Sequence, residues 1–277
     1  MTLSLGNKKR MLRRIETTTA KNVLPRQAYP EDRHELSGAS AVLFLLGDKR
    51  GGNGKTPEPC LILNKRSHRV RQPGDLCCPG GGVMPALDPL LGKALSLPGF
   101  PLAKWPQWKG HLAERPAHAR MLRTLFSTAL RESFEEMRLI PLDVTFLGPL
   151  PSQDLVLFKR TIFPMIGWVG HQKHFYPNWE VAKVVNIPIK KLLDPANYVR
   201  YQYAFSVPGS GRTAWQTYDA PCFLHRHHQE KEVLWGATCR ITLTFLKIVF
   251  DFEPPAVPTL PVERARLDAS YANGARS

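Results

Sequence analysis

The sequence lacks a hydrophobic run long enough to cross a bilayer, which takes about 20 consecutive apolar residues. Its longest apolar runs are residues 41–46 and 241–250, and Lys247 interrupts the second of them. The basic residues near the start are followed by no apolar core, so a secretory signal is not expected. We therefore expect a cytoplasmic protein with no membrane partner, and the arginine-rich start leaves organellar targeting open.

Cysteine is scarce and shows no paired pattern. The chain has five cysteines, and none belongs to a Cys-x-x-Cys pair. This argues against a disulfide framework and against a four-thiolate zinc site, and it fits a reducing compartment. Cys222 lies near His225, His227 and His228. Two adjacent zinc ligands are awkward and no second Cys/His pair follows, so loop or partly buried histidines are the favoured interpretation.

Acidic residues are few, with 23 Asp and Glu against 38 Lys and Arg, for a net charge of +15 over 277 residues. This excess of positive charge favours a polyanionic partner, such as nucleic acid, an acidic membrane surface or a phosphorylated small molecule. Charge alone does not separate these partners, and it does not exclude a basic surface without a specific ligand. The 43% apolar and 22% charged residues are ordinary for a globular domain.

Composition divides the chain into three parts. Residues 1–36 are polar and basic, and we expect them to form a basic N-terminal arm, or a short helix, followed by a linker. Residues 37–253 contain strand-type runs and two helical stretches, and they form the main domain. Within it, residues 89–116 are rich in proline and hold two tryptophans, which predicts an irregular insertion that packs these tryptophans onto the domain. Residues 254–277 have four prolines and few large apolar side chains, which predicts a disordered tail.

Residues 117–139 predict a long helix, because their apolar side chains recur at three- and four-residue spacing. At about 100° per residue, Glu132, Glu135 and Glu136 fall along one flank of that apolar stripe. Carboxylates so close together repel one another unless a cation lies among them. Oxygen ligands on a helix suit Mg2+ or Mn2+, which usually bind substrate phosphates as well. Taken alone, such a stretch is more often a solvated helix face.

A known signature matches these residues. Residues 131–139 read Arg-Glu-Ser-Phe-Glu-Glu-Met-Arg-Leu. They resemble the second half of the Nudix box, G-x5-E-x7-R-E-U-x-E-E-x-G-U, in which U is a bulky aliphatic residue. Gly82, followed after five residues by Asp88, resembles the first half, with Asp in place of Glu. The box would place its arginine at position 96, so about 35 residues are inserted before Arg131, and Arg138 stands where the box has glycine.

Further segments resemble the coenzyme A pyrophosphatase branch of the Nudix hydrolases. Residues 62–67, with Gly74 and residues 78–81, are similar to the L-L-T-x-R-S … G-x3-F-P-G-G motif of that branch. Later segments similar to the same branch follow in the same order, at residues 163–167, 180–184 and 234–238. The resemblance implies an α/β (α+β) fold, a Nudix-type α/β/α sandwich with a mixed β-sheet between helices. It also implies a Mg2+- or Mn2+-dependent hydrolase of nucleoside diphosphate linkages, with coenzyme A or acyl-CoA as the leading substrate.

The resemblance assigns roles to individual residues. In the family the box glutamates bind metal, a glycine carbonyl of the preceding turn often joins them, and the base comes from the box or from a later loop. The assignments are Glu132, Glu135, Glu136 and Gly82 for metal, Glu132, Arg131 and Glu180 for catalysis, and Arg66, Gly80 and Gly81 for substrate binding.

Several alternatives stay open. NADH, ADP-ribose and dinucleoside polyphosphates are other substrates of the superfamily. A catalytically weak domain that binds a nucleotide or nucleic acid is a second class of function, because the box is split and Arg138 could lean toward the metal site. A small-molecule nucleotide is favoured over nucleic acid, and a homodimer is left open. The insertion at residues 89–116 is a candidate lid or specificity element.

Overall fold

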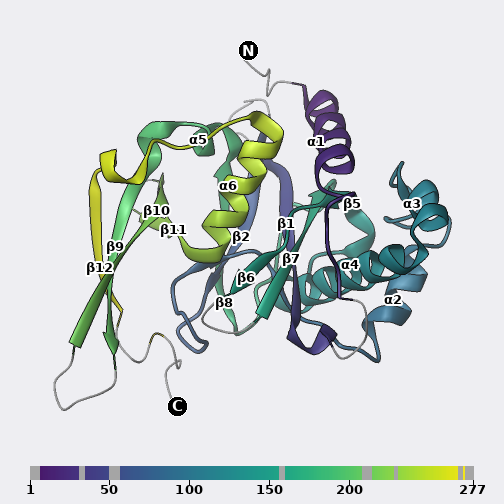
Figure 1. The fold of residues 1–277 in the computed structure, drawn as a ribbon, viewed down its shortest axis with the longest axis horizontal. Coiled ribbons are helices and arrows are strands. Elements are labelled where there is room, and N and C mark those ends of the chain that lie inside the picture. Colours follow the sequence, from purple (N-terminus) through teal and green to yellow (C-terminus); the bar gives the residue numbers. More distant parts are fainter. Residues whose placement is uncertain are drawn as a thin grey trace.

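The computed structural model describes residues 7–30, 35–49, 57–155, 160–207, 214–227, 230–267 and 271. Within these ranges the chain forms two β-sheets with helices packed around the larger one (Figure 1). No helix in these ranges combines the length and apolar character that a membrane span requires.

The larger sheet is mixed and lies at the centre of the protein. Its strands are β1 (Ala39–Lys49), β2 (Glu58–Arg66), β3 (Leu76–Cys77), β4 (Gly80–Gly82), β5 (Val144–Pro149), β6 (Gln153–Leu155), β7 (Arg160–Val169) and β8 (Val181–Pro188). The main order is β3-β2-β1-β7-β5, while β4 pairs with β1, β6 with β7 and β8 with β2. β1 and β7 run parallel, from Ala39 opposite Thr161 to Leu46 opposite Trp168, and the other pairs are antiparallel.

Helices cover both faces of this sheet. They are α1 (Lys8–Asn22), α2 (Asp88–Leu95), α3 (Trp108–Glu114), α4 (Pro116–Met137), α5 (Ile189–Leu192) and α6 (Gly236–Phe250). α1 and α6 share a hydrophobic cluster with Phe44 of β1, and α4 shares another with Leu43. Consecutive side chains of a strand point to opposite faces, so these two residues mark the two sides of the sheet. The expected α/β/α sandwich with a mixed sheet between helices is confirmed.

Helix α1 agrees with the short helix expected as one alternative within residues 1–36, but it is not a separate basic arm. Met11 and Ile15 are buried in the same cluster as α6. Arg14 Nε also donates to the carbonyl oxygen of Val249 at 2.6 Å, at the end of α6. The two apolar residues are four positions apart and so share one helix face, which the many basic side chains around them obscured. Helix α1 is therefore part of the packed domain.

Helix α4 confirms the long helix predicted at residues 117–139. Most of its apolar stripe is buried, through Leu122, Leu125, Phe126, Ala129, Leu130, Ser133 and Met137. Phe134, which the same spacing places on that stripe, is instead 44% exposed. The helix ends at Arg138, whose backbone is left-handed with φ 55° and ψ 37°. Glycine adopts this conformation freely, whereas arginine there costs about 1 kcal/mol. The guanidinium carbon of Arg138 lies 5.2 Å from the centre of the Phe134 ring.

Residues 89–116 are not the irregular insertion that their prolines predicted, because they contain most of α2 and all of α3. A Cβ on Gly92 would lie 2.8 Å from the carbonyl oxygen of Arg123, so this glycine lets α2 approach α4 closely. α2 has its proline in the first turn, where the missing N–H does not interrupt a helical bond. Trp105 and Trp108 are only 2% and 3% exposed, which confirms that the segment packs both tryptophans onto the domain.

Two histidines connect this segment to the chain that follows α1. His118 Nε2 lies 2.7 Å from the carbonyl oxygen of Gln27, which can only accept, so this nitrogen carries a proton. His118 Nδ1 therefore accepts a hydrogen bond from His111 Nε2 at 3.0 Å. Burial lowers the pKa of His111 to about 4, and the neighbouring His118 adds to the effect. Burial also lowers the pKa of His118, so both rings are neutral near pH 7.

A second sheet includes part of the C-terminal segment. Its strands are β9 (Tyr198–Val207), β10 (Ala214–His227), β11 (Glu230–Leu234) and β12 (Val262–Leu267), in the order β11-β10-β9-β12 (Figure 1). The disordered tail expected at residues 254–277 is therefore wrong for β12, which pairs in parallel with β9. Without β12, β9 would be an edge strand with unpaired backbone groups. β9 is thus the pairing partner of β12, and the composition of the C-terminal segment alone could not reveal it.

Candidate active site

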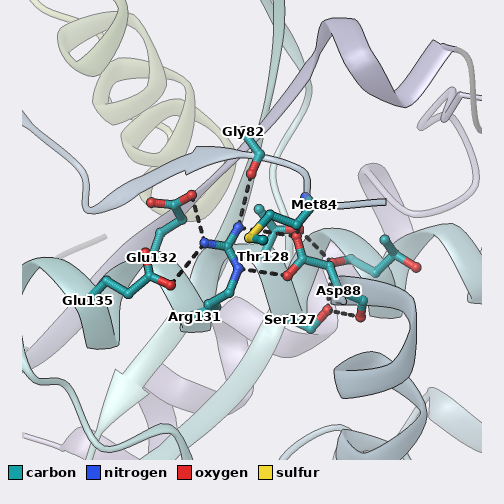
Figure 2. Close-up of polar contacts among 9 residues, drawn as sticks. Gly82, Met84, Asp88, Ser127, Thr128, Arg131, Glu132 and Glu135 are labelled. Carbon is teal, nitrogen blue, oxygen red and sulfur yellow. Dashed lines mark hydrogen bonds and ion pairs between the residues drawn. The ribbon is translucent and has the colours of Figure 1, made fainter. Parts of the chain in front are cut away.

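Arg131 is the centre of a polar network between α4 and the segment before α2 (Figure 2). Its guanidinium donates to the two carboxylate oxygens of Asp88 at 2.8 and 3.2 Å, and to the carbonyl oxygen of Gly82 at 3.0 Å. Its Nη1 lies 3.0 Å from Glu132 and 3.2 Å from Glu135. Burial acts to lower the pKa of Arg131, but the bond to Asp88 and the surrounding carboxylates have the larger effect. The pKa of Arg131 is therefore raised above its ordinary value. The four-residue spacing of Arg131 and Glu135 on one helix accounts for their contact, and the arginine also joins β4 to α4.

Asp88 anchors this arginine, a role that sequence reasoning did not assign. The residue is 0% exposed. Its Oδ2 also accepts from Thr128 Oγ1 and from the backbone N–H of Met84, each at 2.7 Å. A buried carboxylate with this many donors makes strong charge-assisted bonds, which fix the orientation of the guanidinium. The sequence signal for this role is its position six residues after Gly82, where the Nudix box has glutamate.

The three consecutive glycines, which the resemblance places in the turn before the box glutamates, form strand β4 instead. They pair with β1, Gly82 opposite Ser40, Gly81 opposite Ala41 and Gly80 opposite Val42. A Cβ on Gly81 would lie 2.5 Å from the carboxyl carbon of Glu132. A Cβ on Gly80 would lie 2.4 Å from the carbonyl oxygen of Ala41. Glycine therefore lets the backbone of β4 run directly against both β1 and the carboxylate of Glu132.

Glu136 is the glutamate whose titration the structure changes most. Its Oε2 accepts from Asn64 Nδ2 at 2.8 Å, and the backbone N–H of Gly80 also donates to its carboxylate. Burial raises the pKa of Glu136 to about 8, and the charges of Glu132 and Glu180 add to the rise against these two hydrogen bonds. The three glutamates therefore form a local excess of negative charge that a bound cation would relieve.

Backbone contacts bring Glu180 to the box glutamates. The N–H of Asn178 donates to the carbonyl oxygen of Glu136 at 2.8 Å, and the N–H of Ser67 donates to the carbonyl oxygen of Glu180 at 2.8 Å. The turn before β8 therefore lies between the end of α4 and the residue after β2. Glu180 lies near enough to Glu136 for its charge to act on it, and its role as a base stays a prediction.

Arg66, the predicted phosphate-binding residue, is the last residue of β2. Its Nε donates to the carbonyl oxygen of Arg71 at 2.7 Å. Burial raises the pKa of the Cys77 thiol to about 12, with a further rise from Glu136 and an opposing effect from Arg66. Both charged side chains therefore lie close to Cys77, which places Arg66 in the neighbourhood of the glutamates.

The box glutamates and Asn64 have the ligand chemistry that Mg2+ or Mn2+ requires, because carboxylate and amide oxygens are the donors that these ions prefer. The side-chain-free backbone at Gly81 and the buried Oδ1 of Asn64, which has no hydrogen-bond partner in the described ranges, agree with such a site. No three Asp, Glu, His or Cys side chains of the described residues are grouped closely enough to hold a metal ion. The carboxylates of Glu132, Glu135 and Glu136 are instead held by Arg131 and Asn64.

The cysteine and histidine cluster lies in the second sheet. Cys222 and His225 are 0% and 3% exposed on β10. Positions three apart on a regular strand point to opposite faces, so these two side chains do not converge on one ligand. His228 and the side chain of His227 lie outside the described residues.

Comparison with known proteins points to the same class as the box residues. No family model matches the chain. Over 78 residues the chain is 37% identical to an uncharacterized Nudix hydrolase, NudL, of Pectobacterium atrosepticum, and the match spans 27% of this chain and 40% of that protein. The chain thus covers less than half the length of this relative. The match supports the Nudix hydrolase superfamily as the class of the chain.

Two solved structures share parts of the arrangement. A MutT/nudix family protein from Enterococcus faecalis is 12% identical, with a TM-score of 0.42 over 88% of this chain and 75% of that chain. A Nudix hydrolase from M. smegmatis, RenU, is 15% identical, with a TM-score of 0.35 over 56% of this chain and 73% of that chain. These scores are too low to support a conclusion about activity.

Proposed function

We propose that the chain is a Mg2+- or Mn2+-dependent hydrolase that cleaves the pyrophosphate bond of a nucleoside diphosphate linked to another moiety. The observation that carries this proposal is the network of Arg131, which ties Gly82 of β4 to Glu132 and Glu135 of α4. Glu136 lies half-buried next to that network, within the electrostatic influence of Glu132 and Glu180. Carboxylates beside a half-buried glycine backbone suit the binding of metal-associated phosphates.

The reaction adds one water across the phosphoanhydride, breaks one P–O bond and gives two phosphate products. A bound divalent cation supplies charge neutralisation and lowers the pKa of a water molecule. In this proposal Glu132, Glu135, Glu136 and the Gly82 carbonyl are the oxygen ligands, and Arg131 keeps the box glutamates in place. Glu180 takes the proton of the attacking water, and Arg66 binds phosphate oxygens through its planar fork, beside the backbone of Gly80 and Gly81.

Coenzyme A or acyl-CoA is the leading substrate, which would give 3′,5′-ADP and phosphopantetheine. The similarity of residues 62–67 and 78–81 to the coenzyme A pyrophosphatase branch supports this choice. NADH, ADP-ribose and dinucleoside polyphosphates are the alternative substrates. The alternative of a catalytically weak binding domain relied on Arg138 leaning toward the carboxylates. The structure gives it another contact, because its guanidinium carbon lies 5.2 Å from the centre of the Phe134 ring.

The proposal is tested by incubating the protein with Mg2+ or Mn2+ and each candidate substrate, and by identifying the products by mass. We expect hydrolysis of at least one of coenzyme A, acyl-CoA, NADH, ADP-ribose and diadenosine polyphosphates, and its loss when EDTA is added. Glu136→Gln should lower the rate at least ~100-fold, because a metal carboxylate is removed. Glu114→Gln is the matched control, since Glu114 is exposed on α3 outside the network, and it should keep full activity.

Two results would contradict the proposal. Equal rates for the wild type and Glu136→Gln would remove the metal assignment. No hydrolysis of any compound, combined with nucleic-acid binding that weakens steeply with salt, would favour a binding domain instead.

A further inference from the structure

Trp179 is a large apolar side chain that the fold does not use. It is 59% exposed, and within the described ranges neither its ring nor its indole N–H has a partner. The other tryptophans with described side chains have structural roles. Three of them are at most 3% exposed, and one donates its indole N–H to Asp75 at 3.0 Å; they are Trp105, Trp108, Trp168 and Trp235. Because an exposed indole leaves apolar surface in water, a role outside the fold is the better explanation for Trp179.

The position of Trp179 indicates what that role is. Asn178 Oδ1 accepts from the backbone N–H of Glu180 at 2.8 Å, so Trp179 is the central residue of a tight turn. The N–H of Asn178 bonds to the backbone of Glu136, and the carbonyl of Glu180 bonds to the backbone of Ser67. The exposed indole therefore projects from a turn that is fixed on one side to a metal-binding candidate. On the other side it is fixed to the residue after Arg66, a phosphate-binding candidate.

We infer that Trp179 binds the purine base of the substrate by stacking, next to the site that holds its diphosphate. This inference rests on the proposed function, because the diphosphate site supplies the neighbour that makes a nucleotide the occupant. In a nucleoside diphosphate a single ribose separates the charged groups from a flat aromatic base. An indole ring at the edge of a phosphate site matches that spacing of charge and π-surface, and any base offers a face to stack on.

A second group of aromatic rings near Arg66 is less suited to this task. Tyr201, Tyr203 and Tyr271 surround Trp235, with ring centres 5.0 to 6.0 Å from its own. The indole N–H of Trp235 is taken up by Asp75, and Tyr201 is 8% exposed. These rings pack against one another, whereas Trp179 has a large exposed surface to offer.

The test compares two probes in the presence of Mg2+ by calorimetry: ADP, which carries a base, and inorganic pyrophosphate, which does not. Loss of one stacked base costs about tenfold in affinity, within a range of roughly 5- to 150-fold. Trp179→Ala should therefore weaken ADP binding about tenfold and leave pyrophosphate binding within about twofold. Trp179→Phe keeps an aromatic face and should restore most of the affinity for ADP.

Tyr176→Ala is the matched control. Tyr176 is 68% exposed in the same segment, but its N–H bonds to the carbonyl of Met137, one residue farther from the site than Glu136. It should change ADP affinity less than twofold. Because both side chains are exposed, neither substitution should shift the melting temperature by more than about 2 °C.

The outcomes separate this inference from the proposed function. If hydrolysis is absent but Trp179→Ala weakens ADP and spares pyrophosphate, the proposed function fails and base stacking stands. If the protein hydrolyses its substrate and Trp179→Ala binds ADP as the wild type does, the inference fails by itself. Equal weakening of ADP and pyrophosphate would also overturn it. So would a selective loss for acyl-CoA with normal ADP binding, because the indole would then contact the acyl chain.

Discussion

Replacement of Asp88 by asparagine tests whether the buried pair with Arg131 holds the catalytic helix in place. Asp88 is 0% exposed, and the side chain of Arg131 is 8% exposed. Removing one partner of a buried ion pair costs about 3–5 kcal/mol. Since Glu132 and Glu135 remain near the guanidinium, we expect the free energy of unfolding to fall by about 2–4 kcal/mol. In the Asp88→Asn variant an amide NH2 also replaces one of the two carboxylate oxygens. At the position of Oδ1 this NH2 would face the donor Arg131 Nε, and at the position of Oδ2 it would face the donors of Thr128 and Met84.

The assay is urea denaturation followed by circular dichroism, together with thermal melting. A loss of 2–4 kcal/mol corresponds to a decrease in melting temperature of about 5–15 °C for a chain of this size. Glu135→Gln is the internal control, because Glu135 pairs with the same arginine but its side chain is 51% exposed. It should cost less than about 0.5 kcal/mol. A loss below about 1 kcal/mol in Asp88→Asn, or an equal loss in Glu135→Gln, would refute the reasoning.

Two further predictions follow from the contacts. Gly81→Ala places a Cβ 2.5 Å from the carboxyl carbon of Glu132. Because this carboxylate is flexible and can move aside, we expect a stability change below about 1 kcal/mol but a rate loss of about 10- to 100-fold. Normal kinetics in a folded variant would contradict this. The pKa of His111 is lowered to about 4 in the folded state, so between pH 6.5 and 4 the unfolded chain binds one more proton than the folded chain. The free energy of unfolding therefore decreases as the pH is lowered through this range. Denaturation at pH 7 and pH 5 should show a loss of about 1–2 kcal/mol at the lower pH. His111→Gln should reduce this difference, and the part that remains is expected from His118, whose pKa burial also lowers. An unchanged loss in the variant would assign it to other groups.

The sequence predicted local features better than pairings between distant segments. The helix of Glu132 could be predicted because its own residues repeat with helical spacing, and the strands of the central sheet contain the apolar runs assigned to them. β12 could not be predicted, because polar residues become a strand only when β9 is there to pair with them. The glycines of β4 suggested a turn for the same reason, since their strand conformation depends on β1.

The site shows the same division. The spacing of the glutamates predicted that they share one side of α4, and the Arg131–Glu135 contact followed from it. The anchoring role of Asp88 depends on Thr128 and Met84, which meet it only in the folded chain. The packing of helix α1 on the domain was hidden by its basic side chains, since the pattern of only two buried apolar residues is short.

The ion pair of Asp88 and Arg131 also has a consequence for how this protein can change. The two residues are 43 positions apart in the chain, yet they are held at 2.8 Å. The long interruption of the Nudix box therefore begins and ends at one point in space, where its two ends are fastened together. A shorter or different connection could join the same two points without moving the glutamates. The interruption thus lies in a place where length can be gained or lost, as long as the replacement still covers the core against which Trp105 and Trp108 pack.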